Sequence, residues 1–450
     1  MLISVIGCGY LGAVHAAGMA MLGHQVVGID VDEAKVAKLN AGQAPFHEPG
    51  FDELLAEQIA SGRLSFSTDP AAGAQAKIHF IGVGTPQLPG RNAADMRYVR
   101  AAVENLLTHA DPVDGPAIIA GKSTVPVGTA AQIAQAAEDS GKDLIVVWNP
   151  EFLREGFAVQ DTLHPDRIVY GLPDDPARAE LATKIMDDCY RQLLDEEIPR
   201  LTMDYATAEL VKVAANSFLA TKISFINAMA ELCDATGGDV TELAHAIGFD
   251  PRIGNKFLRA GIGFGGGCLP KDIRAFMARA GELGVEQALT FLREVDAINL
   301  RQRTRTVELA SQLVGGRFIG CKVAVLGAAF KPDSDDLRDS PALDIAQQIW
   351  ARGADVVITD PAATDNLRQH RPNLCVVDDL EDALRDADLV LLLTEWEQYV
   401  NLDPTWAKTL VRQPRIIDGR NVLDPQVWLD AGWEYRGIGR HADPTHSAAL

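Results

Sequence analysis

The sequence predicts an α/β protein in which two regions of alternating strands and helices flank a helical middle region. Short β-branched runs alternate with helical stretches over about the first 200 residues, and the same rhythm returns after Gly320. Between the two regions, residues 204–235 contain no proline or glycine, and apolar residues recur there at helical spacing. A chain of 450 residues is too long for one ordinary domain, so two or three domains are expected.

The first region contains six short runs that are typical of buried strands. They cover residues 2–6, 25–30, 78–83, 117–120, 144–148 and 167–170. The last region contains four more, at residues 322–326, 355–359, 389–393 and 415–417. Because helical stretches separate the runs, we expect two largely parallel sheets covered by helices.

The middle region contains two long helical segments. The first covers residues 204–235 and is stopped by Gly237 and Gly238, and the second covers residues 285–314. These patterns divide the chain into an α/β domain at residues 1–201, a helical domain at 202–314, a second α/β domain at 315–440 and a disordered tail at 441–450.

Charge and cysteine content exclude several classes of function. The chain has 62 Asp and Glu against 41 Lys and Arg, a net charge of −21, which argues against nucleic acid or anionic membranes as partners. No basic signal-peptide region opens the chain, and no run approaches the roughly 18 apolar residues of a membrane helix. The six cysteines are scattered without a CxxC pair, so we expect no metal site and no disulfide framework, and a cytoplasmic location.

A glycine pattern directly follows the first predicted strand. Residues 5–12 read VIGCGYLG, which places Gly7, Gly9 and Gly12 in a GxGxxG pattern that opens a helix. Gly7 permits a tight turn, Gly9 lets backbone N–H groups approach a pyrophosphate, and Gly12 lets the helix pack close to the sheet. The pattern predicts a Rossmann-type dinucleotide site.

Asp30 ends the second predicted strand, 18 residues after Gly12. A carboxylate there can hold the adenosine ribose hydroxyls. It would repel the extra phosphate of NADP by about 4 kcal/mol at a separation of about 4 Å and an effective dielectric near 20, so the position favours NAD. The alternative is a glycine turn followed by an aspartate that caps the next helix.

The segment 261–272 reads GIGFGGGCLPKD and places one cysteine, Cys268, after five glycines. Proline is favoured in a first helical turn, so a helix is expected to begin near Pro270. Glycines allow a ligand to approach closely, and a helix N-terminus favours a thiolate, which is the reactive form of a cysteine nucleophile. The alternative is a mobile glycine hinge with a bystander cysteine. We interpret the other five cysteines as packing residues.

Residues 263–272, GFGGGCLPKD, resemble the catalytic-cysteine motif of the UDP-glucose/GDP-mannose dehydrogenase family. Further segments resemble this family in the same order, over about residues 1–440: KSTVP at 122–126, NPEFLREG at 149–156, the E-x-x-K-x-x-x-N helix motif at 209–216, RIG at 252–254 and FK at 330–331. Two positions depart from the pattern. Gly267 stands where Ser is common, and Ser334 stands where Thr is usual.

The resemblance implies a four-electron oxidation of a primary alcohol to a carboxylate with two NAD used in turn. Cys268 would form a thiohemiacetal and then a thioester. Lys212 and Asn216 lie four apart on one helical face and would stabilise the developing oxyanion. Asp272 would polarise the hydrolytic water. Glu151 and Thr124 would handle the proton, directly or through a water.

The resemblance also implies two sets of binding residues and no metal. The expected NAD contacts are Gly7, Gly9, Tyr10, Leu11, Gly12, Asp30, Lys35, Thr85, Thr124, Glu155, Lys271 and Arg338. The expected substrate contacts are Glu151, Phe152, Leu153, Arg154, Glu155, Lys212, Asn216, Arg252, Phe257, Gly265, Phe330, Lys331 and Arg420. Members of the family dimerise, and Arg252 would reach across the dimer interface.

The resemblance favours UDP-glucose as the substrate, because HPDRIV at residues 164–169 is similar to a segment of the UDP-glucose branch. GDP-mannose remains an alternative, since Cys-Leu-Pro at 268–270 also occurs in that branch, and a UDP-N-acetylhexosamine is a further one. A non-catalytic nucleotide-sugar sensor that binds NAD only for structure is the alternative from another class. The complete set of expected catalytic residues argues against it.

Overall fold

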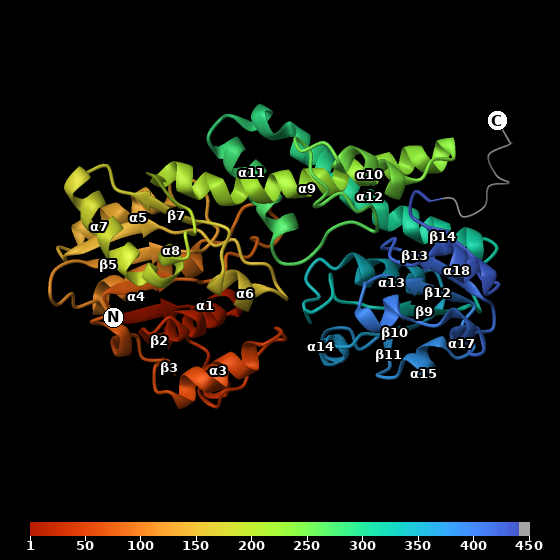
Figure 1. Ribbon diagram of the computed structural model, residues 1–450, viewed down its shortest axis with the longest axis horizontal. Coiled ribbons are helices and arrows are strands. Elements are labelled where there is room, and N and C mark those ends of the chain that lie inside the picture. The colour runs from red at the N-terminus through yellow and green to blue at the C-terminus, as the bar shows by residue number, and fades with distance from the viewer. Residues whose placement is uncertain (441–450) are drawn as a thin grey trace. The chain divides into compact units, whose positions relative to one another are not determined.

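The structure, a computed structural model, describes residues 1–440 (Figure 1). The predicted disordered tail at 441–450 lies outside the described residues. The described residues divide into two compact units: residues 1–215 with 274–284 form the first, and residues 216–273 with 285–440 form the second. The long helix α9 (Tyr205–Thr236) and helix α11 (Leu269–Glu282) each begin in one unit and end in the other.

An eight-stranded sheet forms the centre of the first unit, in the order β3-β2-β1-β4-β5-β6-β7-β8. All neighbours are parallel except β6 and β7. The strands are β1 (Leu2–Ile6), β2 (Gln25–Ile29), β3 (Leu64–Ser67), β4 (Ile78–Ile81), β5 (Ala117–Gly121), β6 (Leu144–Trp148), β7 (Ile168–Leu172) and β8 (Arg200–Asp204).

Helices cover both faces of this sheet. They are α1 (Tyr10–Met21), α2 (Glu33–Asn40), α3 (Phe51–Ala60), the 3-10 helix η1 (Pro70–Gly73), α4 (Arg97–His109), α5 (Thr129–Asp139), α6 (Ala158–Leu163), α7 (Pro176–Cys189) and α8 (Arg191–Asp195). Strand β5 shows why two layers form. Ile118 belongs to the core that includes α1 and α3, and Ile119 belongs to the core under α4 and α5. Successive side chains of a strand point to opposite faces.

A six-stranded parallel sheet forms the centre of the second unit, in the order β11-β10-β9-β12-β13-β14. The strands are β9 (Lys322–Leu326), β10 (Asp355–Thr359), β11 (Cys375–Val376), β12 (Leu389–Leu392), β13 (Arg415–Asp418) and β14 (Glu434–Gly437). Counted along the chain, both sheets therefore contain the strand order 3-2-1-4-5-6, which is typical of dinucleotide-binding folds. The sequence alone does not reveal this relation.

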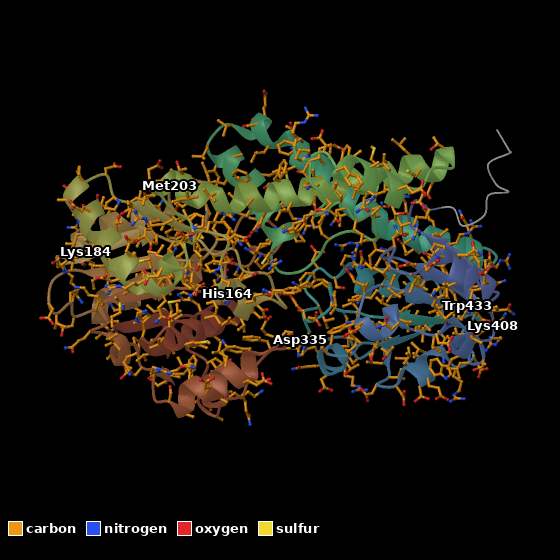
Figure 2. The ribbon with its side chains drawn as sticks, in the orientation of Figure 1. His164, Lys184, Met203, Asp335, Lys408 and Trp433 are labelled. Atoms are coloured by element: carbon orange, nitrogen blue, oxygen red, sulfur yellow. The ribbon has the colours of Figure 1, made fainter. Side chains whose placement is uncertain are left out.

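The second unit also contains most of the helical middle region and its own covering helices. These are α10 (Val240–Gly248), the 3-10 helix η2 (Glu286–Leu289), α12 (Thr290–Leu313), α13 (Pro341–Ala351), α14 (Thr364–His370), α15 (Leu380–Leu384), α16 (Glu397–Val400), α17 (Pro404–Lys408) and α18 (Pro425–Asp430). The core on one face of the sheet contains Trp433, whose ring lies 4.9 Å from that of Trp428 and whose indole donates to the Pro404 carbonyl at 2.9 Å (Figure 2).

The predicted fold class is confirmed. All ten expected strands exist, and the two expected helical segments correspond to α9 and to η2 with α12. Four strands were not predicted, namely β3, β8, β11 and β14. They are short or carry polar residues, so they lack the continuous apolar runs of the inner strands. Over residues 1–440, none of the helices is both long and apolar enough to cross a membrane.

Candidate active site

The glycine loop after β1 is shaped to receive a pyrophosphate. Gly7 has a φ of +89°, and a Cβ there would lie 2.6 Å from Val83 Cγ1. A Cβ on Gly12 would overlap the Gly7 carbonyl oxygen. Helix α1 begins directly after Gly9, with neither a side-chain cap nor an acidic residue in its first turn. The N-terminal N–H groups of α1 thus offer an anion site, and these residues fit a bound dinucleotide.

Asp30 lies at the carboxyl end of β2, as predicted. Its carboxylate accepts the Cys8 N–H at 2.9 Å and the Asp32 N–H at 3.0 Å. The Lys35 ammonium, another expected NAD contact, lies 2.9 Å from the same carboxylate. Asp32, not Asp30, caps α2 through the Lys35 N–H. The alternative reading of Asp30 as a helix cap is therefore wrong.

Sequence reasoning missed Glu48, which fixes three separate segments of the first unit. Its buried carboxylate accepts the Gly156 N–H at 2.6 Å and the Ala158 N–H at 2.7 Å. The Tyr10 hydroxyl, at the start of α1, donates to the same carboxylate. Glu48 therefore holds Tyr10 beside the segment that carries Glu155. No local pattern marks Glu48, since its partners lie far away in the sequence.

Glu151 and Lys212, which the resemblance placed in the catalytic set, form an ion pair within the first unit. Lys212 Nζ lies 2.9 Å from Glu151 Oε1, and both side chains are largely buried. The Leu153 N–H donates to Glu151 Oε2 at 2.6 Å, and the Phe152 ring lies 5.8 Å from Lys212 Nζ. Each oxygen of Glu151 thus has a fixed partner. The pair therefore orients both side chains.

Two other expected contacts of the first unit, Thr85 and Thr124, are joined by a hydrogen bond. Thr124 follows β5, and its carbonyl accepts the Thr85 hydroxyl at 2.7 Å, which joins two predicted NAD contacts. Lys122 is buried beside the rings of Phe80 and Tyr190, and burial lowers its pKa to about 8. The carboxyl ends of neighbouring parallel strands share one edge of a sheet, which is the edge where α/β folds bind ligands.

Two predicted substrate contacts make other bonds in the single chain. Arg154 pairs with Asp161 at 2.6 Å. Arg252 pairs with Asp250 at 2.6 Å, and 87% of its side chain is exposed. Phe257, nearby in sequence, is also exposed and has a φ of +64°. The structure therefore leaves Arg252 and Phe257 on the surface of their own chain.

Cys268 directly precedes α11, and its carbonyl accepts the Asp272 N–H at 2.9 Å. The helix therefore begins where Pro270 predicted, and the thiol stands at its N-terminus. Cys268 is exposed. Among the other cysteines, Cys8, Cys189 and Cys233 are buried as expected, and burial raises the pKa of the Cys189 thiol to about 12.

The packing interpretation is wrong for Cys375 and only partly right for Cys321. Cys375 is exposed and Cys321 is half-buried. Cys375 lies in β11, a two-residue strand at the edge of the second sheet.

Asp272 lies one turn into α11 and is almost completely buried, with 1% of its surface exposed. Its Oδ2 accepts the side-chain amide of Asn216 at 2.7 Å, and its Oδ1 pairs with Lys271 Nζ at 2.6 Å. Three predicted residues of the second unit therefore form one hydrogen-bonded group. Lys271 was expected as an NAD contact, and in this structure its ammonium is bound to Asp272.

The three glycines before Cys268 pack against the segment at residues 330–339. A Cβ on Gly266 would lie 2.8 Å from the Phe330 ring. A Cβ on Gly265 would overlap the Asp339 carbonyl, and a Cβ on Gly267 would overlap the Arg338 guanidinium. A serine at position 267, which is common in the family, would require the exposed Arg338 guanidinium to move.

Arg420 joins the glycine loop to the carboxyl edge of the second sheet. Its guanidinium donates to the carbonyls of Leu393 at 2.7 Å, Phe330 at 3.1 Å and Gly263 at 3.2 Å. Burial lowers the pKa of this guanidinium. Lys331 follows Phe330, with its ammonium 5.5 Å from that ring. Two of the predicted substrate contacts, Phe330 and Arg420, thus lie together.

Family models match most of the chain, in three consecutive parts. Residues 1–194 match the NAD binding domain of the UDP-glucose/GDP-mannose dehydrogenase family, residues 206–301 its central domain and residues 324–425 its UDP binding domain. The chain belongs to this family. The resemblance stated from the motifs is therefore confirmed, and the glycine loop and Asp30 lie within the part that matches the NAD binding domain.

Relatives match this family member along its whole length. A UDP-glucose 6-dehydrogenase of Rhizobium meliloti is 39% identical over 98% of this chain and 100% of its own. UDP-glucose 6-dehydrogenase TuaD of Bacillus subtilis is 39% identical over 98% of this chain and 93% of its own. A solved UDP-glucose dehydrogenase from Pyrobaculum islandicum superposes with a TM-score of 0.87 at 38% identity, covering 98% of each chain. A solved UDP-D-ManNAc dehydrogenase from Pyrococcus horikoshii superposes with a TM-score of 0.84 at 28% identity, covering 98% of this chain and 100% of its own.

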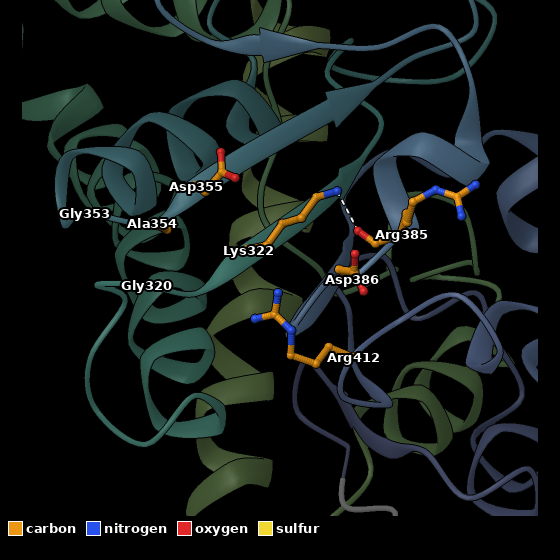
Figure 3. A pocket seen from close by; sticks show the side chains of 8 residues that line it. All are labelled: Gly320, Lys322, Gly353, Ala354, Asp355, Arg385, Asp386 and Arg412. Carbon is orange, nitrogen blue, oxygen red and sulfur yellow. Dashed lines mark hydrogen bonds between the residues drawn. The ribbon is translucent and has the colours of Figure 1, made fainter.

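A pocket of about 560 Å³ lies at the opposite edge of the second sheet, where β9 and β10 begin (Figure 3). Lys322, Arg385 and Arg412 line it, together with Asp386. The Lys322 ammonium donates to the Arg385 carbonyl at 2.6 Å, and Arg412 pairs with Asp388 at 2.9 Å. None of the predicted site residues lines this pocket.

Proposed function

We propose that this chain catalyses the NAD-dependent oxidation of UDP-glucose to UDP-glucuronate, with Cys268 as the nucleophile. The observation that carries the proposal is the exposed thiol at the N-terminus of α11, beside the buried Asn216–Asp272 pair. Identity of 39% to a UDP-glucose 6-dehydrogenase over nearly the full length of both chains supports this choice of sugar.

The first α/β unit would bind the cofactor. The N–H groups at the start of α1 would hold the pyrophosphate, and Asp30 would accept the adenosine ribose hydroxyls. NAD supplies the hydride acceptor for both oxidations when it is bound. The residues of this chain bind and orient the reactants, move the protons and provide the covalent step.

In the first oxidation, Glu151 and Thr124 would take the proton of the primary alcohol, directly or through a water. Lys212 would hold the Glu151 carboxylate in place during this step, since its ammonium lies 2.9 Å from Glu151. The buried position of the pair strengthens the interaction, because the local dielectric is lower than in water.

In the second stage, the Cys268 thiolate would attack the aldehyde carbon and form a thiohemiacetal. Lys212 and Asn216, one turn apart on α9, would stabilise the developing oxyanion. Oxidation of the thiohemiacetal leaves a thioester on Cys268. Asp272 would then polarise a water that hydrolyses the thioester, which releases the carboxylate product and restores the thiol.

The second α/β unit would bind the UDP part of the substrate. Residues 324–425 match the UDP binding domain of the family, and this stretch contains Phe330, Lys331 and Arg420. An ammonium and a guanidinium are suited to a diphosphate, and an aromatic ring is suited to a base or sugar face. We further propose that residues 1–201, 202–314 and 315–440 act as the cofactor, dimerisation and substrate domains.

A homodimer is part of the proposal. Phe218, Phe225 and Leu232 recur at seven-residue spacing on one side of α9, and 67%, 49% and 56% of their surfaces are exposed in the single chain. Two helical turns separate successive members, so they form an apolar stripe that a second copy could cover. Arg252 would then enter the partner's substrate site. A reduced cytoplasm suits this enzyme, because the mechanism requires a free thiol at Cys268.

The test is NADH formation by the purified protein with NAD and a panel of nucleotide sugars. UDP-glucose should give the highest kcat/KM and yield UDP-glucuronate with two NADH per sugar. A preference for GDP-mannose or a UDP-N-acetylhexosamine would move the assignment within the family. Binding without NADH formation from any sugar would instead indicate a non-catalytic sensor.

A further inference from the structure

Helix α12 carries two buried polar side chains, Asn299 and Arg303, one turn apart and therefore on the same face. The Asn299 amide binds the backbone of Phe264 in both directions: it accepts the Phe264 N–H at 2.7 Å and donates to the Phe264 carbonyl at 3.0 Å. A Cβ on Gly263 would overlap the same amide. The glycine loop that leads to Cys268 is thus fixed at its start by α12.

Arg303 binds the segment that packs on the end of the same loop. Its Nη2 lies 2.8 Å from Asp339 Oδ1 and 3.3 Å from the Asp339 carbonyl, and its Nη1 lies 3.3 Å from Asp344 Oδ2. Asp339 has a φ of +46°, a left-handed conformation that is uncommon for residues other than glycine. The guanidinium holds both the side chain and the carbonyl of Asp339 and so supports that conformation.

The segment at residues 330–339 connects Asp339 to the glycine loop that precedes Cys268. The Gly266 N–H donates to the Arg338 carbonyl at 2.9 Å. A Cβ on Gly265 would overlap the Asp339 carbonyl, and a Cβ on Gly266 would lie 2.8 Å from the Phe330 ring. A shift of the segment would therefore disturb Gly265 and Gly266, which shortly precede Cys268.

Stability alone does not account for a buried arginine at this position. Only 4% of Arg303 is exposed, whereas Asp339 and Asp344 are partly exposed, and Arg303 Nε has no hydrogen-bond partner among the described residues. The cost of desolvating a buried charge often offsets the attraction to its partners, so a buried ion pair is weak evidence for net stability. A fork of donors that reaches two carboxylates and a carbonyl instead gives defined geometry.

We propose that Arg303 is a positioning residue for Cys268, acting through Asp339 and the segment at residues 330–339. This inference rests on the proposed function, since it takes Cys268 as the nucleophile. Arg303 sets the direction of the thiol and its distance from the reacting carbon without contact to the substrate. A displacement of about 1 Å at a nucleophile can lower the rate about 100-fold.

The test compares Arg303→Ala and Arg303→Lys with Arg301→Ala. Arg301 is an exposed arginine of the same helix, α12, and pairs with Glu231 of α9. Lysine keeps the charge but cannot bridge Asp339 and Asp344 at once. Both Arg303 variants should lose about 100-fold in kcat, with KM for NAD and for UDP-glucose within about threefold of the parent. Guanidinium ion should restore part of the kcat of Arg303→Ala and leave Arg301→Ala unchanged.

A second readout needs no substrate: the rate at which iodoacetamide alkylates Cys268, followed by peptide mapping across a pH series. The dependence of the Cys268 alkylation rate on pH should differ from the parent in the Arg303 variants and should match the parent in Arg301→Ala. Unchanged alkylation in the folded fraction, together with a parental kcat, would overturn the proposal even if thermal stability falls. If Arg303→Ala does not fold, Arg303→Lys decides. If the parent does not oxidise UDP-glucose, the proposed function fails, and the alkylation profiles still decide the role of Arg303.

Discussion

The side-chain amide of Asn216 donates to the Asp272 carboxylate at 2.7 Å, and both residues are buried. This bond links α9 to the first turn of α11, directly after Cys268. Since the other oxygen of Asp272 pairs with Lys271, the carboxylate is held in one orientation. The residue proposed to stabilise the oxyanion therefore takes its own orientation from the residue proposed to act on the thioester.

The hydrogen bond between Asn216 and Asp272 predicts how the isosteric substitution Asn216→Asp affects activity. Asn216→Asp would place a second buried carboxylate against Asp272, so that the two must share a proton, and it would remove an oxyanion donor. We expect kcat with UDP-glucose to fall by about 100-fold or more. The exposed substitution Asn373→Asp adds the same charge and should have little effect. Parental kcat in Asn216→Asp would show that the amide has no part in the reaction.

Cofactor choice should depend on Asp30. Asp30→Ala should weaken NAD binding and shift the NAD:NADP preference by at least about tenfold, because the repulsive carboxylate is lost. Lys35, which now lies 2.9 Å from Asp30, would also become available to the extra phosphate of NADP. The double variant Asp30→Ala, Lys35→Ala should therefore accept NADP less well than Asp30→Ala alone. Asp32→Ala is the matched control, and an unchanged ratio in Asp30→Ala would contradict the assignment.

The buried His79 predicts a loss of stability in acid. Burial lowers its pKa from 6.5 to about 4, so the folded state binds this proton more weakly than the unfolded state does. The contribution of neutral His79 is complete above pH 6.5 and is lost as the pH falls toward 4. Between pH 7.5 and 5 the loss should be about 2 kcal/mol.

His79→Asn provides the comparison, since its amide can still bond to Ser4, which lies 2.7 Å from His79 Nδ1. Urea unfolding should be used to measure the free energy of unfolding of the parent and the variant across this pH range. As the pH falls, this free energy should decrease less in the variant than in the parent. Parallel curves would show that His79 is not the group responsible.

Dimer formation should require the apolar stripe on α9. Phe225→Asp would place a charge at its centre and should give a monomer by analytical ultracentrifugation, whereas Val427→Asp, at another exposed apolar position, should not. An Arg252→Ala protein mixed with a Cys268→Ala protein should regain up to about a quarter of the parental activity, because half of the dimers would be hybrids with one complete site. No recovery after verified subunit exchange would count against a shared site.

Local patterns in the sequence predicted most of the fold. The inner strands are continuous apolar runs such as LVLL at 389–392, and the glycines and Pro270 mark where α1 and α11 begin. Edge strands such as β3 and β14 were missed, because half-exposed strands mix polar and apolar residues. The duplicated strand order became visible only in the structure, since topology depends on long-range pairing and not on local composition.

Some residues of the candidate site could likewise be predicted from local sequence patterns, and others could not. The glycine loop, Asp30 and Cys268 could be predicted because each belongs to a short pattern with its own chemistry. Glu48, Asn299 and Arg303 could not, because their function lies in bonds to residues far away along the chain. Glu48 and Gly156, for example, are 108 positions apart. Nor does sequence show that Lys271 pairs with Asp272 or that Arg338 fills the space beside Gly267.

The most direct test of the central claim is to trap the covalent intermediate on Cys268. Asp272→Asn keeps the thiol and removes the group proposed to activate water, so with UDP-glucose and excess NAD it should release a burst of about two NADH per site and then slow sharply. Intact-mass analysis of the quenched protein should show a UDP-glucuronyl adduct, and peptide mapping should place it on Cys268. Cys268→Ala should show no adduct and no sustained acid production. An adduct on another cysteine, or normal UDP-glucuronate formation by Cys268→Ala, would contradict the mechanism.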